Sequence, residues 1–161
     1  MKGIYLLLGT NLGDRMANLQ RAKELMMTKM ITVIRESSVY ETAAWGIEDQ
    51  PSFLNQVVQI DFYRAPSRLL ALLLEIEEQI GRVREEKWGS RLIDIDILYF
   101  KDELIDEKDL QVPHPEIANR RFTLLPLVEL APSLLHPANG KTQQELLDET
   151  TDPLEVKLFN S

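Results

Sequence analysis

The sequence predicts an α+β fold in which two helices pack on an antiparallel sheet. Residues 2–8 form a short run of bulky apolar residues, typical of a buried strand, that ends at Gly9. Apolar residues then recur at helical spacing over 12–30 and again over 66–81. β-Branched or alternating apolar residues predict three further strands, at 31–40, 53–62 and 93–100. The resulting order, β-α-β-β-α-β with a short C-terminal extension, is that of a ferredoxin-like sandwich with its helices on one face.

The first helix is expected to have Asn11 as its N-cap, with Asp14 in the first turn, where the helix dipole favours a negative charge. Its apolar stripe is rich in methionine, and we expect this stripe to face the core. The stripe consists of Leu12, Met16, Leu19, Met26 and Met30.

The second helix is expected to begin near Pro66, which is tolerated in a first turn, and to end at Gly81. The segments 41–51 and 82–91 are rich in small, turn-forming or charged residues, and we expect both to be loops. Six prolines after residue 112 leave room only for short helices and strands in the last third of the chain.

Composition narrows the class of protein. The 161 residues, 44% of them hydrophobic, predict a single domain over 1–161. The absence of cysteine excludes thiolate zinc sites. The two histidines, His114 and His136, are too few for a multi-histidine metal site. We expect His136 to be structural. A formal net charge of −8 argues against nucleic acid or an anionic membrane as a partner. Because no apolar run approaches the ~20 residues of a membrane helix, and turn residues follow the short N-terminal apolar run, we expect a cytoplasmic protein. We expect a monomer, because no predicted helix has an obvious apolar face left exposed.

Asp94 and Asp96 interrupt the apolar strand at 93–100. Residues two apart in a strand share a face, so both carboxylates are expected to project together, about 6.6 Å apart, while the intervening isoleucines face the other way. Adjacent carboxylates repel each other, and a bound cation would offset this repulsion. Oxygen ligands without thiols or clustered histidines favour Mg²⁺, which takes one or two carboxylates together with phosphate oxygens and water.

Four basic residues precede this strand in an otherwise acidic protein, at Arg82, Arg84, Lys87 and Arg91. Guanidinium groups bind phosphate through two parallel hydrogen bonds, and several of them on one loop can contact a polyphosphate. Together with the aspartates they favour metal-assisted phosphoryl transfer. The alternative is a solvated loop whose charges pair with neighbouring glutamates.

A second group of residues suits a flat heterocycle. Phe53 and Asn55 share one face of a predicted strand, so a ring stacked on the phenylalanine could also be hydrogen-bonded by the asparagine amide. Thr42, Trp45 and Phe122 belong to the same group. The alternative interpretation is a set of core aromatic residues with a turn asparagine.

Taken together, these segments resemble the 6-hydroxymethyl-7,8-dihydropterin pyrophosphokinase family of folate biosynthesis over essentially the whole chain. The resemblance rests on six blocks that occur in the same order and spacing. The blocks are 9–14 (GTNLGD), 40–42 (YET), 50–55 (QPSFLN), 81–97 (GRVR, WGSR and DIDI), 112–115 (VPHP) and 119–122 (NRRF).

The resemblance implies transfer of pyrophosphate from ATP to the hydroxymethyl group of the pterin, with release of AMP. It implies two Mg²⁺ ions, bridging the ATP phosphates, on Asp94 and Asp96, and gives Asp96 a part in deprotonating the attacking hydroxyl. Arg82, Arg84 and Arg91 are implied to be catalytic and phosphate-binding residues. The implied nucleotide site comprises Glu77, Arg82, Arg84, Trp88, Arg91, Ile97, His114 and Arg120.

The resemblance also implies a pterin site in which Phe53 and Phe122 sandwich the ring and Asn55 reads its hydrogen-bonding edge. The loops at 41–51 and 82–91 are then expected to close over the substrates and exclude water. The implied pterin-binding residues are Thr42, Ala43, Trp45, Phe53, Asn55 and Phe122.

Two other functions remain open from the sequence. One is a different nucleotide-dependent transferase that uses the same aspartate strand, for which AMP would not be a product. The other is a small-molecule-binding regulatory module of ferredoxin-like fold without catalysis. Replacing Asp96 with alanine should leave ligand affinity nearly intact in such a module and abolish turnover in the pyrophosphokinase.

Overall fold

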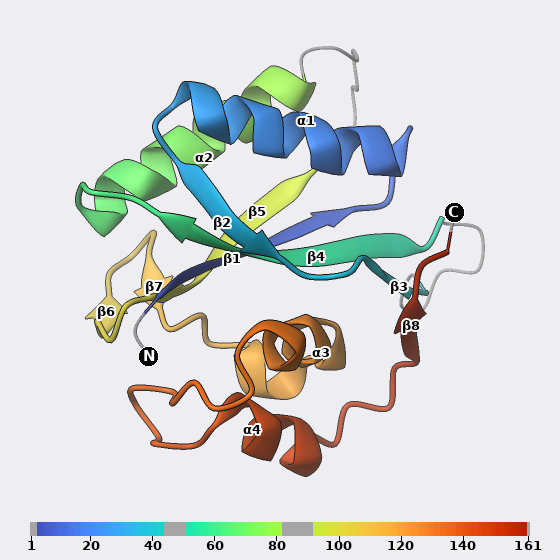
Figure 1. Cartoon of the computed structure of the whole chain (residues 1–161), viewed down its shortest axis with the longest axis vertical. Helices are drawn as coiled ribbons and strands as arrows, with labels where there is room; N and C mark the ends of the chain where they lie inside the picture. The colour runs from blue at the N-terminus through green and yellow to red at the C-terminus, as the bar shows by residue number, and fades with distance from the viewer. Residues whose placement is uncertain (1–2, 44–50, 82–91, 161) are drawn as a thin grey trace.

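The computed structural model describes residues 3–43, 51–81 and 92–160. Its centre is a six-stranded antiparallel sheet in the order β5-β1-β4-β3-β8, with β2 paired to the remaining length of β4 (Figure 1). A small hairpin of β6 (Ile105–Asp106) and β7 (Gln111–Val112) follows the edge strand β5. The strands of the main sheet are β1 (Ile4–Thr10), β2 (Thr32–Glu36), β3 (Tyr40–Thr42), β4 (Phe53–Asp61), β5 (Asp94–Phe100) and β8 (Val156–Leu158).

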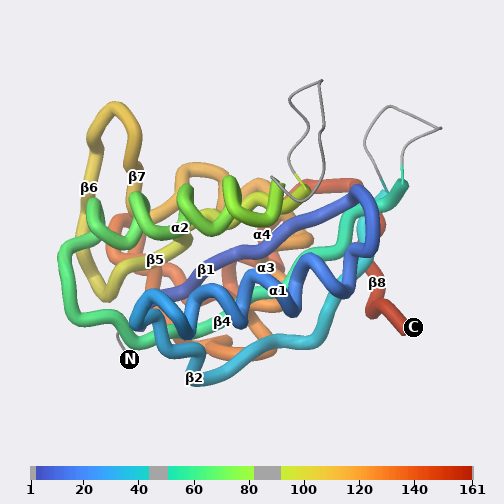
Figure 2. Tube along the Cα trace, turned by 90° about the horizontal axis from the view of Figure 1, so that it is seen from above, coloured from blue at the N-terminus to red at the C-terminus, as the bar shows by residue number. Residues whose placement is uncertain are grey.

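Helices cover both faces of this sheet (Figures 1 and 2). On one face lie α1 (Arg15–Thr28) and α2 (Pro66–Gly81), so the predicted ferredoxin-like arrangement is confirmed, with three strands instead of two between these helices. The expected single helical layer is incomplete, because the C-terminal third adds a second layer on the other face. This second layer consists of the 3-10 turn η1 (Ile117–Asn119), α3 (Arg121–Leu130) and α4 (Gln143–Glu149).

The second helical layer explains why the first strand has no polar face. Ile4, Leu6 and Leu8 are buried in the cluster beneath α1 and α2. Tyr5 and Leu7, which point the other way, are buried in the cluster beneath α3 and α4. A strand covered on both faces needs apolar side chains at every position, and the sequence accordingly shows a continuous apolar run.

The first helix begins later than the sequence predicts. Its N-cap is Asp14, whose side chain accepts a hydrogen bond from Ala17 N at 3.1 Å. Gly13 adopts a positive φ of 67° and turns the chain before the helix can start. The predicted cap, Asn11, is instead buried and donates to Pro51 O at 3.4 Å.

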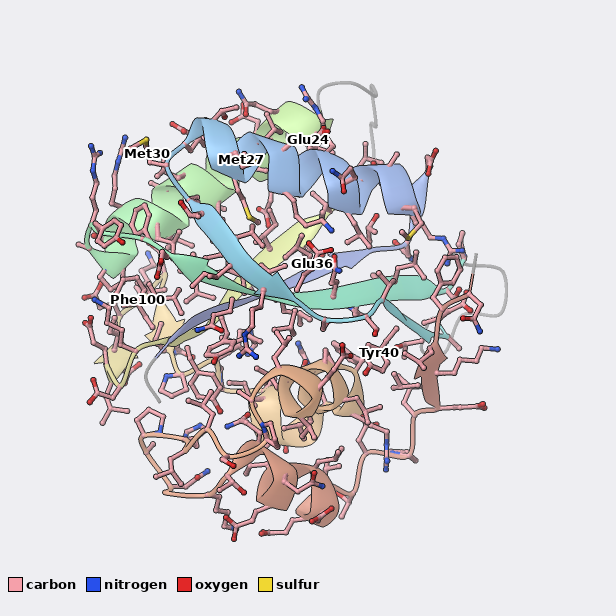
Figure 3. The ribbon with its side chains drawn as sticks, in the orientation of Figure 1. Glu24, Met27, Met30, Glu36, Tyr40 and Phe100 are labelled. Atoms are coloured by element: carbon pink, nitrogen blue, oxygen red, sulfur yellow. The ribbon has the colours of Figure 1, made fainter. Side chains whose placement is uncertain are left out.

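The predicted core-facing stripe of α1 is wrong at Met16 and Met30, whereas Leu12 packs against the core. Met16 is 42% exposed. Met30 is 79% exposed, because the helix ends at Thr28 and Met30 follows it with a positive φ. Figure 3 places Met27 and Met30 at the outer surface around the end of α1, so the helix does carry exposed apolar side chains. The residues of α1 that are buried are Leu19, Ala22, Leu25 and Met26.

The single strand predicted at 31–40 is two strands, β2 and β3, which pair with different parts of β4. Between them, Ser37 N donates to Val57 O at 2.8 Å, after which the chain leaves the β2 ladder. Glu129 of α3 holds the connection by accepting from Ser38 N at 2.9 Å and from the Tyr40 hydroxyl at 2.7 Å. A segment whose local pattern is that of one strand is therefore divided at the place where it is hydrogen-bonded to α3.

His136 has the structural role expected of it. Its ring meets Tyr99 edge-on with centroids 5.7 Å apart, and its Nδ1 accepts from Ala138 N at 3.2 Å. The Tyr99 hydroxyl is buried and hydrogen-bonded to the Gln143 amide of α4, which ties β5 to the second helical layer.

None of the helices in the described ranges is long and apolar enough to span a lipid bilayer.

Candidate active site

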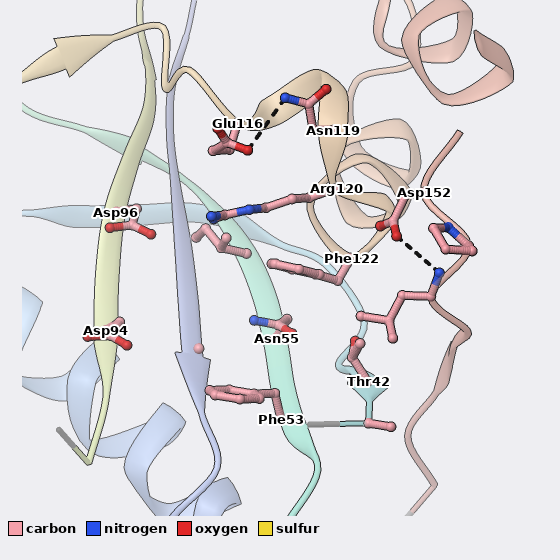
Figure 4. Close-up of a pocket in the computed structure, with 15 residues that line it drawn as sticks. Thr42, Phe53, Asn55, Asp94, Asp96, Glu116, Asn119, Arg120, Phe122 and Asp152 are labelled. Atoms are coloured by element: carbon pink, nitrogen blue, oxygen red, sulfur yellow. Dashed lines mark hydrogen bonds between the residues drawn. The ribbon is translucent and has the colours of Figure 1, made fainter. Parts of the chain in front are cut away.

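The principal cavity of the described structure has a volume of about 580 Å³ and lies on the α3 side of the sheet (Figure 4). Strands β1, β3, β4 and β5 supply its sheet wall, the turn from η1 into α3 supplies a second wall, and the segment 152–154 supplies a third. Its lining residues are Leu7, Gly9, Thr42, Ala43, Phe53, Asn55, Asp94, Asp96, Glu116, Asn119, Arg120, Phe122, Asp152, Pro153 and Leu154.

The two aspartates of β5 lie together on the cavity side of the sheet. Asp94 is exposed and Asp96 is half-buried, and both carboxylates point into the cavity (Figure 4). Ile95 and Ile97 point the other way into the core beneath α1 and α2. The predicted alternation of side chains along β5 is therefore present: the aspartates face the cavity, and the isoleucines on the other face are buried.

Gly9 connects the acidic side of the cavity with the aromatic side. In the sheet register Gly9 lies between Asn55 of β4 and Asp94 of β5. A Cβ atom added at Gly9 would lie 2.8 Å from Asn55 Nδ2, closer than real Cβ contacts come. The glycine therefore leaves the space that the asparagine amide occupies on the cavity floor.

The aromatic side of the cavity has the composition expected for a flat, polar ring. Phe53 and Phe122 extend from opposite walls, with the Asn55 amide close by on the sheet (Figure 4). Asn55 Oδ1 and Thr42 Oγ1 are buried, and neither has a hydrogen-bond partner among the described residues. A buried polar atom without a partner costs free energy, so these two atoms favour a ligand that donates hydrogen bonds between the rings.

A second cavity of about 350 Å³ adjoins β5, and Asp96 lines both cavities. Ile97 and His114, which the sequence assigns to the nucleotide site, line this second cavity together with Lys108 and Asp109. Asp96 thus lies where the larger cavity, with its two phenylalanines, meets the smaller cavity lined by His114 and Lys108.

His114 faces Asp96 from the turn that follows β7. Its Nε2 lies 4.0 Å from Asp96 Oδ2, while its Nδ1 accepts from Glu116 N at 3.1 Å. The accepting Nδ1 leaves the ring proton on Nε2, directed at the carboxylate. Burial lowers the pKa of His114 below its ordinary value, and the opposing effect of the Asp96 charge does not reverse this shift.

Glu77 of α2 binds the backbone of the aspartate strand. Its Oε2 accepts from Ile95 N at 2.7 Å, between the two aspartates. The structure therefore places this predicted nucleotide-site residue against β5, where it helps to fix Asp94 and Asp96.

Arg120 brings positive charge to the acidic side of the cavity. Its side chain extends from the η1–α3 turn toward Asp96 in Figure 4, and its guanidinium carbon lies 5.6 Å from the centre of the Phe122 ring. Of the other residues that the sequence assigns to the site, Trp45, Arg82, Arg84, Trp88 and Arg91 lie outside the described ranges.

Several cavity residues carry no signal in the sequence. Leu7 follows the pattern of a core strand, and Glu116 resembles an ordinary turn residue. Asn119 belongs to the 119–122 block of the family resemblance, which gives it no role in the site. Asp152 and Leu154 reach the cavity only because the chain returns from α4 to the start of α3, where Arg121 N donates to Asp152 Oδ2 at 2.8 Å. No local pattern reports such a return of the chain.

The donor set of the site fits Mg²⁺ better than a softer metal. Within the described ranges, no group of three or more His, Cys, Asp or Glu side chains is placed to hold a metal ion by itself. Two carboxylates beside an open cavity, Asp94 and Asp96, leave the remaining coordination positions to water and to oxygen atoms of a ligand. Mg²⁺ is commonly bound in this way.

The structure is that of a ferredoxin-like protein with two cavities that adjoin at Asp96. A family model described as 7,8-dihydro-6-hydroxymethylpterin-pyrophosphokinase (HPPK) matches residues 5–132, and the chain belongs to this family.

Curated relatives carry the same assignment. A 2-amino-4-hydroxy-6-hydroxymethyldihydropteridine pyrophosphokinase of Aquifex aeolicus is 41% identical over 151 residues, which cover 94% of each chain. The Bacillus subtilis protein of the same name is 43% identical over 143 residues, 88% of this chain and 86% of the relative.

Among solved structures, wild-type Plasmodium falciparum HPPK-DHPS superposes with a TM-score of 0.72 at 17% identity. The match covers 92% of this chain and 44% of that longer chain, and it supports the fold.

Proposed function

We propose that this chain transfers pyrophosphate from ATP to the hydroxymethyl group of 6-hydroxymethyl-7,8-dihydropterin, releasing AMP, in folate biosynthesis. Membership of the pyrophosphokinase family supports this activity. The observation that carries the proposal is the position of Asp96 on the boundary between the two cavities, because a transfer between two substrates needs groups that reach both.

The pterin binds in the larger cavity. Its ring stacks between Phe53 and Phe122, and its donor groups satisfy the buried oxygens of Asn55 and Thr42. Ala43 lines the same end of the cavity. Trp45 is proposed to complete this site.

ATP binds in the smaller cavity with its phosphates extending toward the aspartates. Ile97 and His114 line the cavity, and Glu77 holds the strand between the aspartates. Arg120 approaches the same phosphates from the other wall. Arg82, Arg84, Trp88 and Arg91 are proposed to complete the nucleotide site.

Asp94 and Asp96 would hold two Mg²⁺ ions with the ATP phosphates. When bound, the metal supplies neutralisation of phosphate charge and alignment of the displaced groups. Asp96 also reaches the hydroxymethyl group and accepts its proton, while His114 directs its Nε2 proton at Oδ2 of the same carboxylate.

The two alternatives gain no support. A different nucleotide-dependent transferase would not account for the family match over residues 5–132. A regulatory module without catalysis has no need for two carboxylates that face a cavity. A cytoplasmic monomer remains our proposal for the state in which the enzyme works.

Product analysis with ATP, Mg²⁺ and the pterin tests the proposed function. We expect AMP only when pterin and metal are both present. Asp96→Asn, which keeps the size of the side chain and removes its charge, should lower kcat by at least about a hundredfold while the melting temperature stays close to that of the parent. Formation of ADP, or AMP formation that survives Asp96→Asn unchanged, would contradict the proposal.

A further inference from the structure

Arg15, in the first turn of α1, connects two segments that border the larger cavity. Its Nη1 donates to Ser52 O and to Ser52 Oγ, both at 2.9 Å, and lies 3.4 Å from Glu41 Oε2. Ser52 Oγ in turn donates to Glu41 Oε2 at 2.5 Å. We refer to Arg15, Glu41 and Ser52 as the Arg15 cluster.

The Arg15 cluster lies on the opposite face of the sheet from the cavity. Glu41 precedes Thr42 and Ser52 precedes Phe53, and successive side chains of a strand point to opposite faces. Thr42 and Phe53 line the cavity and are paired with each other in the register of β3 and β4. The cluster therefore holds, from behind, the pair of strands whose front forms the aromatic side of the cavity.

The strand pairing alone gives this region little support. The β3–β4 ladder contains three residue pairs, and the ladder on the other side of β3, with β8, also contains three. Thr42↔Phe53 is the last pair of the β3–β4 ladder, where strands separate most easily. Hydrogen bonds from a third element, α1, fix the spacing of the two strands at that end.

Arginine suits this position better than lysine does. The side chains of Arg15 and Glu41 are 24% and 23% exposed, so the contacts are partly shielded from water. The guanidinium also lies 5.5 Å from the centre of the Phe159 ring, which follows β8. The contacts to Ser52 and Glu41 all come from Nη1, while the planar guanidinium also lies near the Phe159 ring; an ammonium group offers no such flat face.

Glu41 is ionised in this cluster at neutral pH. The hydrogen bond from Ser52 lowers the pKa of Glu41 below its ordinary value, and the hydrogen bond and charge of Arg15 lower it further. The cluster is therefore electrically balanced, and it acts on the cavity through the position of the strands.

We infer that Arg15 is a positioning residue for the pterin, which sets the separation of Thr42 and Phe53 from the far face of the sheet. This inference rests on the proposed function, because it takes the occupant of the larger cavity to be the pterin. Asp94 and Asp96 lie on β5, and strands β1 and β4 separate them from β3, the strand that carries Glu41 of the Arg15 cluster. Loss of Arg15 should therefore weaken pterin binding and leave nucleotide binding and chemistry intact.

Steady-state kinetics of Arg15→Met test this inference, since methionine keeps an apolar stem and removes every donor. We expect the KM for the pterin to rise by about tenfold, with the KM for ATP and kcat within about twofold of the parent. Arg15→Lys should be intermediate and provides a milder variant if Arg15→Met folds poorly. The matched control is Arg21→Met on the same helix, where the side chain is 59% exposed and lies 4.0 Å from Glu24; it should resemble the parent.

An unchanged KM for the pterin in both Arg15 variants would overturn the inference, as would equal changes in both KM values and kcat, which indicate general destabilisation. A double-mutant cycle with Glu41→Gln adds a second criterion, because the two effects on pterin KM should be far from additive if they belong to one cluster. Equilibrium binding of the pterin to the same variants tests the role of Arg15 separately from the proposed pyrophosphokinase activity. If the parent makes no AMP, the proposed function fails, and the binding series still decides whether Arg15 shapes the larger cavity.

Discussion

At the scale of single residues, the site depends on small features that set which side chains can lie next to one another. Gly9 is the clearest case, since its missing side chain makes room for the Asn55 amide between the aromatic and acidic sides of the cavity. Glycine here serves close approach and not backbone conformation, because a positive φ is recorded for Gly13 and Gly140 but not for Gly9.

Gly9→Ala should therefore displace the Asn55 amide. We expect a loss of stability of about 1–3 kcal/mol from overpacking, and weaker pterin binding with an unchanged KM for ATP. Gly81→Ala is the matched control, because a Cβ there meets nothing within 4 Å and the residue ends helix α2. Chemical denaturation and pterin titration of both variants check the prediction, which is contradicted if the two alanine variants behave alike.

Individual site residues could be predicted from the sequence only where they belong to an alternating strand pattern or to a family motif. Asp94 and Asp96 could be predicted to share a face because strand periodicity is local. The partners of Asp96 could not be predicted in this way, since His114 reaches it from 18 residues further along the chain, in a turn after a separate hairpin.

At the scale of elements, helix α3 carries two of the predicted ligand-binding residues near its start. Arg120 is the N-cap position and makes no side-chain capping bond. Asp152 takes over this role from the C-terminal segment by accepting from Arg121 N at 2.8 Å, and its other oxygen accepts from Leu154 N at 3.0 Å. The carboxylate therefore joins two walls of the cavity as well as satisfying a free N–H at the helix start.

Asp152→Ala should destabilise the protein by about 0.5–2 kcal/mol and raise the KM for the pterin, because the turn that presents Arg120 and Phe122 loses its anchor. Asp148→Ala on α4 is the control, since this exposed carboxylate accepts only from Gln144 of the same helix, at 3.0 Å, in the described structure. Thermal melting and pterin kinetics decide the outcome. Equal effects of the two substitutions on melting temperature and on the KM for the pterin would show that Asp152 does not anchor this turn.

At the scale of the whole molecule, one sheet serves two apolar cores. The cluster beneath α1 and α2 includes Leu73, and the cluster beneath α3 and α4 includes Leu127. Strands β1, β4 and β5 contribute residues to both clusters. The two helical layers therefore pack on opposite faces of the same strands, and loss of either layer would expose apolar side chains of the sheet that supports the other.

This shared sheet predicts a single cooperative unfolding transition, as expected for one domain over 1–161. Leu73→Ala and Leu127→Ala should each cost about 2–5 kcal/mol, and each should shift the unfolding of both helical layers together. Hydrogen exchange of α1 and α3 amides during denaturant titration measures the two layers separately. Two resolved transitions in either variant would argue for independent units.

The ferredoxin-like arrangement of the first hundred residues, the common face of Asp94 and Asp96, and the family could be predicted from the amino-acid sequence. These features depend on periodicity and on short motifs, which are encoded within a few residues. Three features could be seen only in the folded protein. They are the second helical layer formed by the C-terminal third, the division of the strand predicted at 31–40 beside Glu129, and the contacts that Arg15 and Asp152 make next to the cavity. These features arise from contacts between segments far apart along the chain, where the geometry is set by packing of the whole sheet and no local pattern records it.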